Sequence, residues 1–418
     1  MQKNIKNNFN KILSIFILMQ PVLDLITGIC IHKLNINFTL GIIIRIIFLI
    51  FVMLTSIFIY NKKKNIIYYL LFIIYAIIYL LGIILFKDSS IFKEMQGLIR
   101  TFYFPLLFLS LYSIKDDLKL NPKTLVITFF IYLAFIFVPS ILNIGFKTYE
   151  ITKKGTLGFF NSANEISGIL SILTPLIIVY LNKLQKNKYI IITITSIIYM
   201  YVILNMGTKT PLLALILTII MLIVYSVIKN IKNKNYKLVI STFLLFLITT
   251  IAVIAVIPKT NFYKNIETHL DFLEVDNAIE VLEKPKLIDH FIFSQRLTFL
   301  SKKQKIYNNS NIYQKLFGIG YTKDGKEVKM IEMDYFDIFY SHGIIGSILF
   351  FGMYIYLIYK ILHKRKSFDF KQYMLYASLV LIIILSLFTG HIINAPSVSI
   401  IVIYLLMLLQ YKDNKKTS

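Results

Sequence analysis

Long apolar segments, separated by short and lysine-rich connections, run along most of the chain. The hydrocarbon core of a bilayer is about 30 Å thick, so a helix needs roughly 20 apolar residues to cross it. Segments that meet or approach this length predict an all-α integral membrane protein with about twelve transmembrane helices. The predicted spans are 11–31, 39–60, 65–86, 93–113, 124–144, 163–182, 189–206, 209–228, 237–257, 335–360, 371–389 and 395–411.

One connection differs from the others. Residues 258–334 are too polar to cross a membrane, and this segment is much longer than a simple turn. It divides the chain into a bundle of nine helices at 1–257, an extracytoplasmic loop or cap at 258–334 and a bundle of three helices at 335–418. Within it, 279–288 and 291–300 are apolar at helical spacing, which favours a folded helical cap over disorder.

The composition supports a membrane location. Hydrophobic residues make up 57% of the chain and charged residues only 16%, which is more apolar surface than a water-soluble core buries. A formal net charge of +24 would indicate a nucleic-acid partner if the Lys and Arg formed one patch. They lie instead in short clusters between apolar runs, which is typical of topology signals, so no nucleic-acid partner is expected.

The basic clusters also predict the orientation. With a cytoplasmic amino terminus, the inner connections and the two termini carry about four times as many Lys and Arg as the short outer connections. We therefore expect a multi-pass protein of the bacterial cytoplasmic membrane with both termini in the cytoplasm. The inner clusters lie at Lys62–Lys64, Lys115–Lys123, Lys183–Lys188, Lys229–Lys237 and Lys360–Lys371.

Some ionisable side chains fall within the predicted spans, where each costs about a few kcal/mol and is a functional candidate by default. In the orientation just derived, all of them lie near the outer membrane level. A transport path would place such groups near the midplane, so their depth favours a site that faces the outside. These residues are Asp24, Arg45, Arg100, Glu165, Lys209 and Asp337.

Structural explanations for the same residues stay open. Lys209, Glu165 and Asp337 lie near helix ends, from which a charged group can reach the interface. The two arginines lie deeper in their spans, which favours a paired or substrate-facing role. Asp24 follows Pro21 and is a candidate structural partner for either Arg45 or Arg100 as well as a candidate supporting residue.

A second group of candidates lies beside the long loop. Arg296 stands in an apolar stretch, and Glu332, Asp334 and Asp337 lie at the start of the tenth span. A carboxylate there is suited to act as general base on a sugar hydroxyl. The alternative is that these side chains cap the helix and interact with its dipole. The six histidines show no metal-ligand spacing, so neither a metal nor another cofactor is expected.

At four places the sequence resembles the O-antigen ligase and O-antigen polymerase family of bacterial membrane glycosyltransferases. They are Gly158–Glu165, which enters a helix, Gly207–Thr210, which precedes another, Ser294–Arg296 with Gly318–Gly320 in the long loop, and Asp334–Gly346. The plan of about twelve helices, with one large outer loop between late helices, is also similar to that family.

The resemblance implies a metal-independent, inverting transfer of a glycan from an undecaprenyl-diphosphate carrier to an acceptor glycan or lipid at the outer face of the membrane. Cationic side chains would then neutralise the departing diphosphate. Lys209 aligns with a position that is usually arginine in the family, and Arg296 aligns with the loop arginine. Arg100 and Arg45 are further diphosphate-binding candidates by depth. A polysaccharide flippase and a chain-length regulator are candidate partners.

One departure from the family pattern bears on the activity. Family ligases place a histidine, taken as the acceptor-activating base, just ahead of the tenth-helix motif, whereas this chain has Glu332 and Asp334 there and His342 farther along. The departure favours a polymerase of a capsule-like repeat unit over a ligase. The rival hypothesis is a polysaccharide flippase or transporter without transferase activity, which would have short loops throughout and basic residues along a central cavity.

Overall fold

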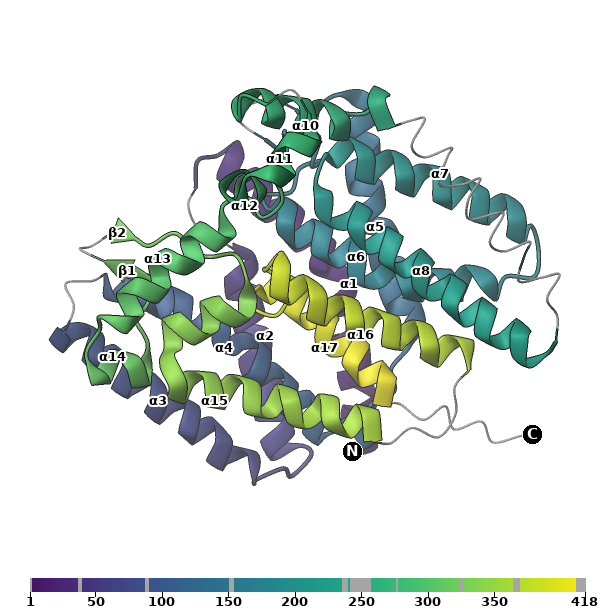
Figure 1. The fold of residues 1–418 in the computed structure, drawn as a ribbon. Helices are drawn as coiled ribbons and strands as arrows, with labels where there is room; N and C mark the ends of the chain where they lie inside the picture. Colours follow the sequence, from purple (N-terminus) through teal and green to yellow (C-terminus); the bar gives the residue numbers. More distant parts are fainter. Residues whose placement is uncertain are drawn as a thin grey trace.

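The long apolar segments form helices that lie side by side, and a group of short helices covers one end of them (Figure 1). In this computed structural model the structure describes residues 2–36, 40–86, 90–149, 154–234, 240, 257–275, 277–323, 326–363 and 369–410. The long helices are α1 (Gln2–His32), α2 (Leu40–Phe58), α3 (Asn65–Phe86), α4 (Ile91–Ser113), α5 (Pro122–Leu142), α6 (Ala163–Asn182), α7 (Lys188–Met206), α8 (Lys209–Lys232), α15 (Asp334–His363), α16 (Phe370–Phe388) and α17 (Pro396–Gln410).

The chain is an all-α integral membrane protein. Within the described ranges, nine helices are long and apolar enough to cross a membrane. Two more described helices coincide with predicted spans but fall short of that criterion: α4 carries Lys93, Glu94 and Arg100, and α17 has only 15 residues. The span predicted at 237–257 lies, apart from single residues, outside the described part of the chain.

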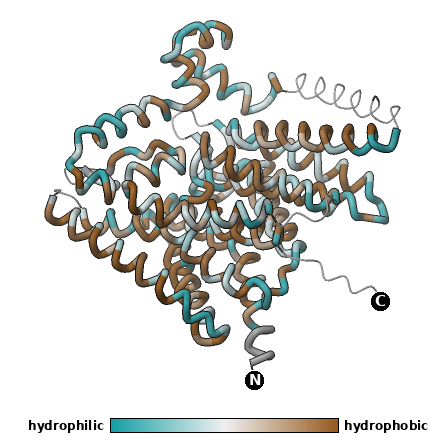
Figure 2. The backbone as a smooth tube through the Cα atoms, turned by 60° about the horizontal axis from the view of Figure 1, so that its bottom comes forward, coloured by the Kyte–Doolittle hydropathy of each residue, from teal (hydrophilic) through white to brown (hydrophobic). Residues whose placement is uncertain are grey.

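Hydrophobic residues make up most of the long helices, and hydrophilic residues lie toward the helix ends and in the cap helices (Figure 2). Large exposed residues such as Ile47, Leu85 and Ile197 would be costly in water over so wide an area. In lipid they face a solvent as apolar as themselves, so packing between the helices depends on close contact rather than on burial of apolar area.

Helix α6 lies at the centre of the bundle, and 78% of the residues in its most apolar stretch are buried. It packs against α5, α7, α8, α16 and α17. Small residues such as Ser167, Gly168 and Ser171 let its neighbours approach closely. Ser167 also hydrogen-bonds to Thr208 at 2.9 Å, and Thr174 to Tyr199 at 2.8 Å, so polar contacts join the central helices.

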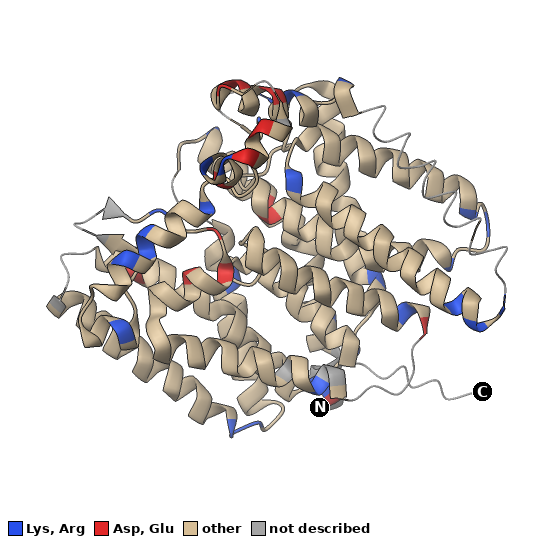
Figure 3. Ribbon diagram, viewed as in Figure 1, with Lys and Arg blue, Asp and Glu red and all other residues tan. Residues whose placement is uncertain are grey.

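We call the described residues between 257 and 333 the cap segment. They form η2 (Ile257–Lys259), α10 (Asn261–Phe272), α11 (Ala278–Glu283), α12 (Pro285–Phe291), α13 (Arg296–Asn308), α14 (Ile312–Phe317) and an antiparallel hairpin of β1 (Thr322–Lys323) and β2 (Lys326–Glu327). Acidic residues gather over the upper helices of this segment (Figure 3). The apolar stretch predicted as one helix at 291–300 is broken, because Ser294 and Gln295 adopt positive φ angles of 52° and 66°.

The cap segment covers the same end of the bundle as the starts of α4, α6, α8, α15 and α17. Contacts across this end show it directly: Glu94 of α4 accepts from the backbone N–H of Thr322 at 2.8 Å, and Lys209 of α8 donates to the carbonyl oxygen of Phe291. The lysine-rich connections for which the sequence predicts a cytoplasmic location, such as η1 (Lys115–Asp117), lie at the opposite helix ends. The 3-10 turn η1 joins α4 to α5 there.

A break in α15 fits this helix against the cap segment. Gly343 has φ 66° and ψ −166°, which only glycine adopts readily, and its Cα faces the backbone of Leu316 and Gly318. A Cβ at this position would lie 2.5 Å from the carbonyl oxygen of Leu316. The break therefore depends on the absence of a side chain.

Gly343→Ala should lower the apparent melting temperature by several degrees, because both the strained dihedral angles and the backbone contact cost about 1–3 kcal/mol. Gly352→Ala in the same helix is the matched control, since nothing lies within 4 Å of its added Cβ. The control should melt at the same temperature or higher, because alanine favours a helix. Thermal unfolding in detergent micelles, followed by circular dichroism, measures both, and equal melting temperatures would contradict the assignment.

Candidate active site

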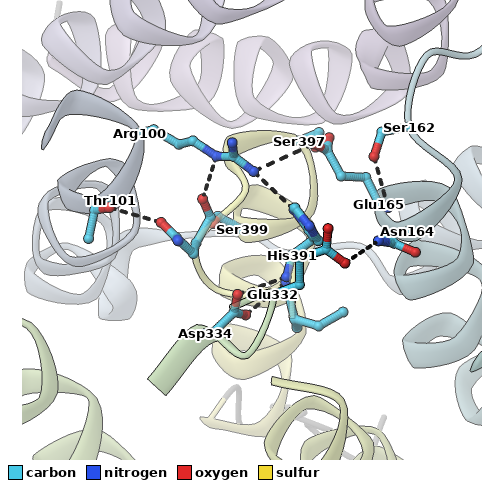
Figure 4. Close-up of polar contacts among 12 residues, drawn as sticks. Arg100, Thr101, Ser162, Asn164, Glu165, Glu332, Asp334, His391, Ser397 and Ser399 are labelled. Carbon is cyan, nitrogen blue, oxygen red and sulfur yellow. Dashed lines mark hydrogen bonds and ion pairs between the residues drawn. The ribbon is translucent and has the colours of Figure 1, made fainter. Parts of the chain in front are cut away.

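Side chains from α4, α6, the start of α15 and the connection between α16 and α17 meet beneath the cap segment (Figure 4). Arg100, Glu165 and His391 point toward one another, and the amide of Asn164 reaches Glu332 (Figure 4). These residues are far apart in the sequence. The site is therefore a product of helix packing and not of a local motif.

Asp337 in the first turn of α15 holds the turn that precedes the helix. Its carboxylate accepts hydrogen bonds from the backbone N–H groups of Ile331 at 2.9 Å, Glu332 at 2.8 Å and Met333 at 3.3 Å. It also pairs with the Nζ of Lys303 at 3.1 Å, and both side chains are almost fully buried. All of these donors converge on one carboxylate at a helix N-terminus, where a negative charge is favoured.

Asp334, one helical turn earlier, holds the connection between α16 and α17 in the same way. Its carboxylate accepts from the backbone N–H groups of His391 at 2.7 Å, Ile392 at 2.9 Å and Ile393 at 2.9 Å. The residue is 2% exposed. The backbone of the connection between α16 and α17 is thus tied to the start of α15 by the side chain of Asp334.

Glu332 differs from these two carboxylates because its side chain is 33% exposed. Its backbone has a positive φ of 62°, and the Cα of Gly390 packs against its carbonyl group. The Oε2 atom lies 3.1 Å from the Nη2 of Arg296 and accepts from the amide of Asn164 at 3.4 Å. Glu332 is thus a carboxylate held in a fixed direction with access to solvent.

Arg100 is held from three sides. Its Nε donates to the carbonyl oxygen of Asn394 at 3.1 Å, and its Nη2 lies 3.0 Å from the Nδ1 of His391 and 4.0 Å from the Oε1 of Glu165. The second oxygen of Glu165 accepts a hydrogen bond from the hydroxyl of Ser397. Arg100 keeps 27% of its side chain exposed, so the guanidinium is oriented without being fully enclosed.

His391 was not selected from the sequence as a site residue. Because an arginine only donates hydrogen bonds, the Nδ1 of His391 must act as the acceptor and the ring proton resides on Nε2. Burial, together with the positive charges of Arg100 and Arg296, lowers the pKa of His391 to about 3. The imidazole is therefore neutral near pH 7 and has an N–H to donate.

Arg45 and Asp24 form a closed pair beside this cluster. The Nη2 of Arg45 lies 2.5 Å from the Oδ1 of Asp24, and its Nε donates to Gln20 at 2.8 Å. The other oxygen of Asp24 accepts from the hydroxyl of Tyr132 at 2.5 Å. The side chains of Arg45 and Asp24 are only 5% and 12% exposed, so their charges are largely satisfied by each other.

Lys209 lies apart from Arg100 and faces the cap segment. Its Nζ donates to the carbonyl oxygen of Phe291 and lies 4.2 Å from the centre of that ring. Among the described residues it has no carboxylate partner within 4.0 Å. His269 lies close enough to feel the charge of Lys209, and its Nε2 is 3.0 Å from the Nδ1 of His290. Lys209 therefore contributes a positive charge that no neighbouring carboxylate cancels.

A second buried polar network anchors the end of the cap segment. Glu94 accepts from the hydroxyl of Tyr79 at 2.6 Å and from the backbone N–H of Tyr321 at 3.0 Å. The hydroxyl of Tyr321 lies 2.6 Å from that of Thr101 and 2.8 Å from the Nε2 of His342. His342 is fully buried here, so it belongs to the anchor and is shielded from solvent.

A family model described as "O-antigen ligase like membrane protein" matches residues 6–287 and 276–412. The chain belongs to this family. A search of curated proteins found no match. Membership supports a multi-pass membrane protein with a role in ligating or polymerising glycans, and it confirms the resemblance drawn from the sequence motifs.

In this O-antigen ligase-like protein the predicted site residues fall into four groups. Arg100, Glu165, Arg296 and Glu332 surround the cluster at His391. Arg45 and Asp24 form the adjoining pair, and Lys209 faces α12. Asp334 and Asp337 lie beneath the cluster, where their carboxylates accept from backbone N–H groups and Asp337 also pairs with Lys303. The sequence signal that could have identified His391 is the group of His391, Asn394 and Ser397 in the short connection between two apolar helices.

Asp334→Asn should destabilise the O-antigen ligase-like protein by about 3 kcal/mol, because an amide offers one acceptor oxygen to three buried N–H donors and turns its own N–H₂ toward them. Asp369→Asn is the control, since Asp369 caps α16 in an exposed position and asparagine caps equally well. Chemical unfolding in detergent micelles compares them. An equal effect of the two substitutions would contradict the role of Asp334.

The histidine pair beside Lys209 predicts a pH dependence. Burial lowers the pKa of His269 from 6.5 to about 4, with Lys209 and His290 adding to the effect. The unfolded chain then binds more protons than the folded one between these values, so stability is complete above pH about 6.5 and falls as the pH drops toward 4. His269→Gln should reduce the slope of the melting temperature against pH across this window, leaving the part that His391 contributes, whereas the exposed His363→Gln should leave the slope unchanged.

Proposed function

We propose that this protein is a membrane glycosyltransferase that polymerises or ligates a cell-surface polysaccharide. Its donor would be a glycan linked to undecaprenyl diphosphate at the outer face of the cytoplasmic membrane, and the transfer would be inverting and independent of metal. The family supports glycan ligation or polymerisation in a membrane. The donor, the stereochemistry and the membrane face are our inferences from the site.

The observation that carries this proposal is the arrangement of Glu332. It is a partly exposed carboxylate, held between Arg296 and Asn164 at a site rich in basic groups. We assign it as the general base. It takes the proton of the acceptor hydroxyl while that oxygen bonds to the anomeric carbon, and the bond from that carbon to the diphosphate breaks with its electron pair on the phosphate oxygen.

The basic groups suit the leaving diphosphate. We assign Lys209 and Arg296 to hold it, since Lys209 has no carboxylate partner among the described residues and Arg296 lies five positions after Phe291, which Lys209 contacts. A fixed cation near a developing negative charge stabilises the transition state, often by several kcal/mol in a water-poor site. A lysine supplies charge without the paired geometry of an arginine.

The remaining predicted residues take supporting roles in this proposal. Asp334 and Asp337 position the two turns on which His391 and Glu332 lie, because their oxygens are occupied by backbone N–H groups. Asp24 and Arg45 support the bundle as a pair. These assignments differ from the sequence-based expectation that Asp334 and Asp337 act as bases and that Arg45 and Arg100 bind diphosphate.

Two observations support the outer face as the location. The site lies at the helix ends opposite the lysine-rich connections, which mark the cytoplasmic side in membrane proteins. The cap segment lies over the site at the same end. Partners consistent with this location are the bilayer, a lipid-linked glycan, an acceptor glycan or lipid, a flippase and a chain-length regulator. A carboxylate in place of the ligase histidine favours a polymerase.

Arg296→Ala should reduce polymer formation about 10²–10³-fold, because the diphosphate loses a stabilising cation. Lipid-linked repeat units should then accumulate, unpolymerised, on the outer leaflet, where an impermeant oxidant of sugar diols detects them. Lys186→Ala is the matched control, since this exposed lysine lies in the connection between α6 and α7, at the opposite end of the bundle.

A flippase would give a different result from the same variant, because the repeat units would accumulate on the inner leaflet. That outcome, or unchanged polymer length and amount in Arg296→Ala and in Glu332→Gln, would refute the proposed function. Western detection of the variants in the membrane fraction establishes that they are made and inserted.

A further inference from the structure

A pocket of about 180 Å³ lies between α1, α2, α4, α6 and the start of α17. Arg45 and Arg100 line it together with Asp24 and Glu165, and Ile42 forms part of an apolar wall. The pocket adjoins the cluster at Glu332. Arg100 and Glu165 belong to both, and Asn164, which binds Glu332, directly precedes Glu165 in α6. The pocket and the base therefore lie on two sides of the first turn of α6.

The charges of this pocket cancel. Arg45 pairs with Asp24 at 2.5 Å and Arg100 faces Glu165 at 4.0 Å, so two cations meet two carboxylates. A diphosphate has only acceptor oxygens and would face both carboxylates, which repel it. Lys209 and Arg296, by contrast, meet only one described carboxylate, Glu332, so one positive charge remains there. The electrostatics thus separate a neutral pocket from a cationic region under α12.

The Arg100–Glu165 pair is also open in a way that suits a hydroxyl group. The 4.0 Å between the Nη2 of Arg100 and the Oε1 of Glu165 exceeds a hydrogen bond. A hydroxyl oxygen placed between them accepts from the arginine and donates to the carboxylate at the same time. The other carboxylate oxygen is already occupied by Ser397, which fixes the direction of Oε1.

We propose that this pocket binds a sugar ring of the acceptor glycan through its hydroxyl groups, and that the donor diphosphate binds outside it, at Lys209 and Arg296. Paired donors and acceptors beside an apolar wall match a sugar, which presents hydroxyls at its edge and C–H groups on its faces. The proposal rests on the transferase function proposed above and names the substrate of this part of the site.

The order of contacts across the site supports the acceptor rather than the donor sugar. The chain of contacts passes from Arg296 to Glu332, to Asn164 and its neighbour Glu165, and then to Arg100. In an inverting displacement the acceptor approaches the anomeric carbon from the side opposite the leaving group. With the diphosphate at Arg296, the acceptor ring belongs beyond Glu332, which is where the pocket lies.

Glu165→Gln separates the two ligand classes, because it removes one negative charge while its amide oxygen still accepts from Ser397. The full-length protein in detergent micelles is titrated with two probes. One is undecaprenyl diphosphate, measured by calorimetry. The other is phosphate-free oligosaccharide released by mild acid from the cell-surface polysaccharide of the same cells, measured by saturation-transfer NMR, which detects weak binding. Glu283→Gln, an exposed change in α11 with the same charge difference, is the control.

Glu165→Gln should weaken oligosaccharide binding about tenfold, since a hydrogen bond to a charged group is lost, and leave undecaprenyl diphosphate binding within about twofold. Tighter binding of undecaprenyl diphosphate would show that the pocket holds phosphate and would overturn the inference, as would unchanged binding of both probes. Wild-type protein that binds only undecaprenyl diphosphate would overturn the pocket assignment alone. Wild-type protein that binds neither probe would overturn the proposed function with it.

Discussion

Two buried carboxylates in the first turn of α15 hold the backbone of the two loops that form the site. Asp337 binds the N–H groups of residues 331–333, and Asp334 binds those of residues 391–393. A buried carboxylate without donors is very unfavourable, so each of these residues specifies one backbone arrangement around itself. Because the two positions lie one helical turn apart on one face, the two loops are brought into contact.

The consequences for the site follow from that contact. The 331–333 turn directs Glu332 outward with a positive φ, and the 390–394 turn directs His391 and Asn394 toward Arg100. Gly390 fits directly against the carbonyl of Glu332, where a Cβ would lie 2.5 Å away. Glu332 lies in the connection before α15, and Arg100 lies in α4. Both are nevertheless positioned by the first turn of α15, through Asp337 and Asp334.

The sequence alone predicted the helices well, and it named several of the residues that the structure brings together in the candidate site. Apolar length identifies a span because the backbone must satisfy its own hydrogen bonds in lipid, and eleven described helices lie at predicted positions. Ionisable residues at one helix end were also recognisable, as Arg100 and Glu165 show. The contact partners of these side chains could not be predicted, because hydropathy carries no information about which helices lie next to each other. The Lys303–Asp337 pair and the contact of His391 with Arg100 therefore became visible only in the structure.

The break in the cap segment at residues 294–295 illustrates the same limit. Apolar spacing over 291–300 predicted one helix, but the carboxylate of Asp289 accepts from the N–H groups of Leu297 and Thr298, both at 2.9 Å. A side chain from the preceding helix thus supplies acceptors for the start of α13, and the chain turns between them. Competition of this kind between a local carboxylate and the helical pattern cannot be read from periodicity.

The cap segment is fixed most firmly where it approaches the site. Glu94 binds the backbone of Tyr321 and Thr322, and the hydroxyl of Tyr321 continues through Thr101 to the side chain of Asn394. The carbonyl of Asn394 accepts from Arg100, so the end of the cap segment and the guanidinium belong to one hydrogen-bonded network. Asp337 adds a second tie through Lys303 of α13. Since both ties use buried carboxylates, displacing this end of the cap segment would expose or orphan a charge, and the orientation of Arg100 is thereby coupled to the position of the cap segment.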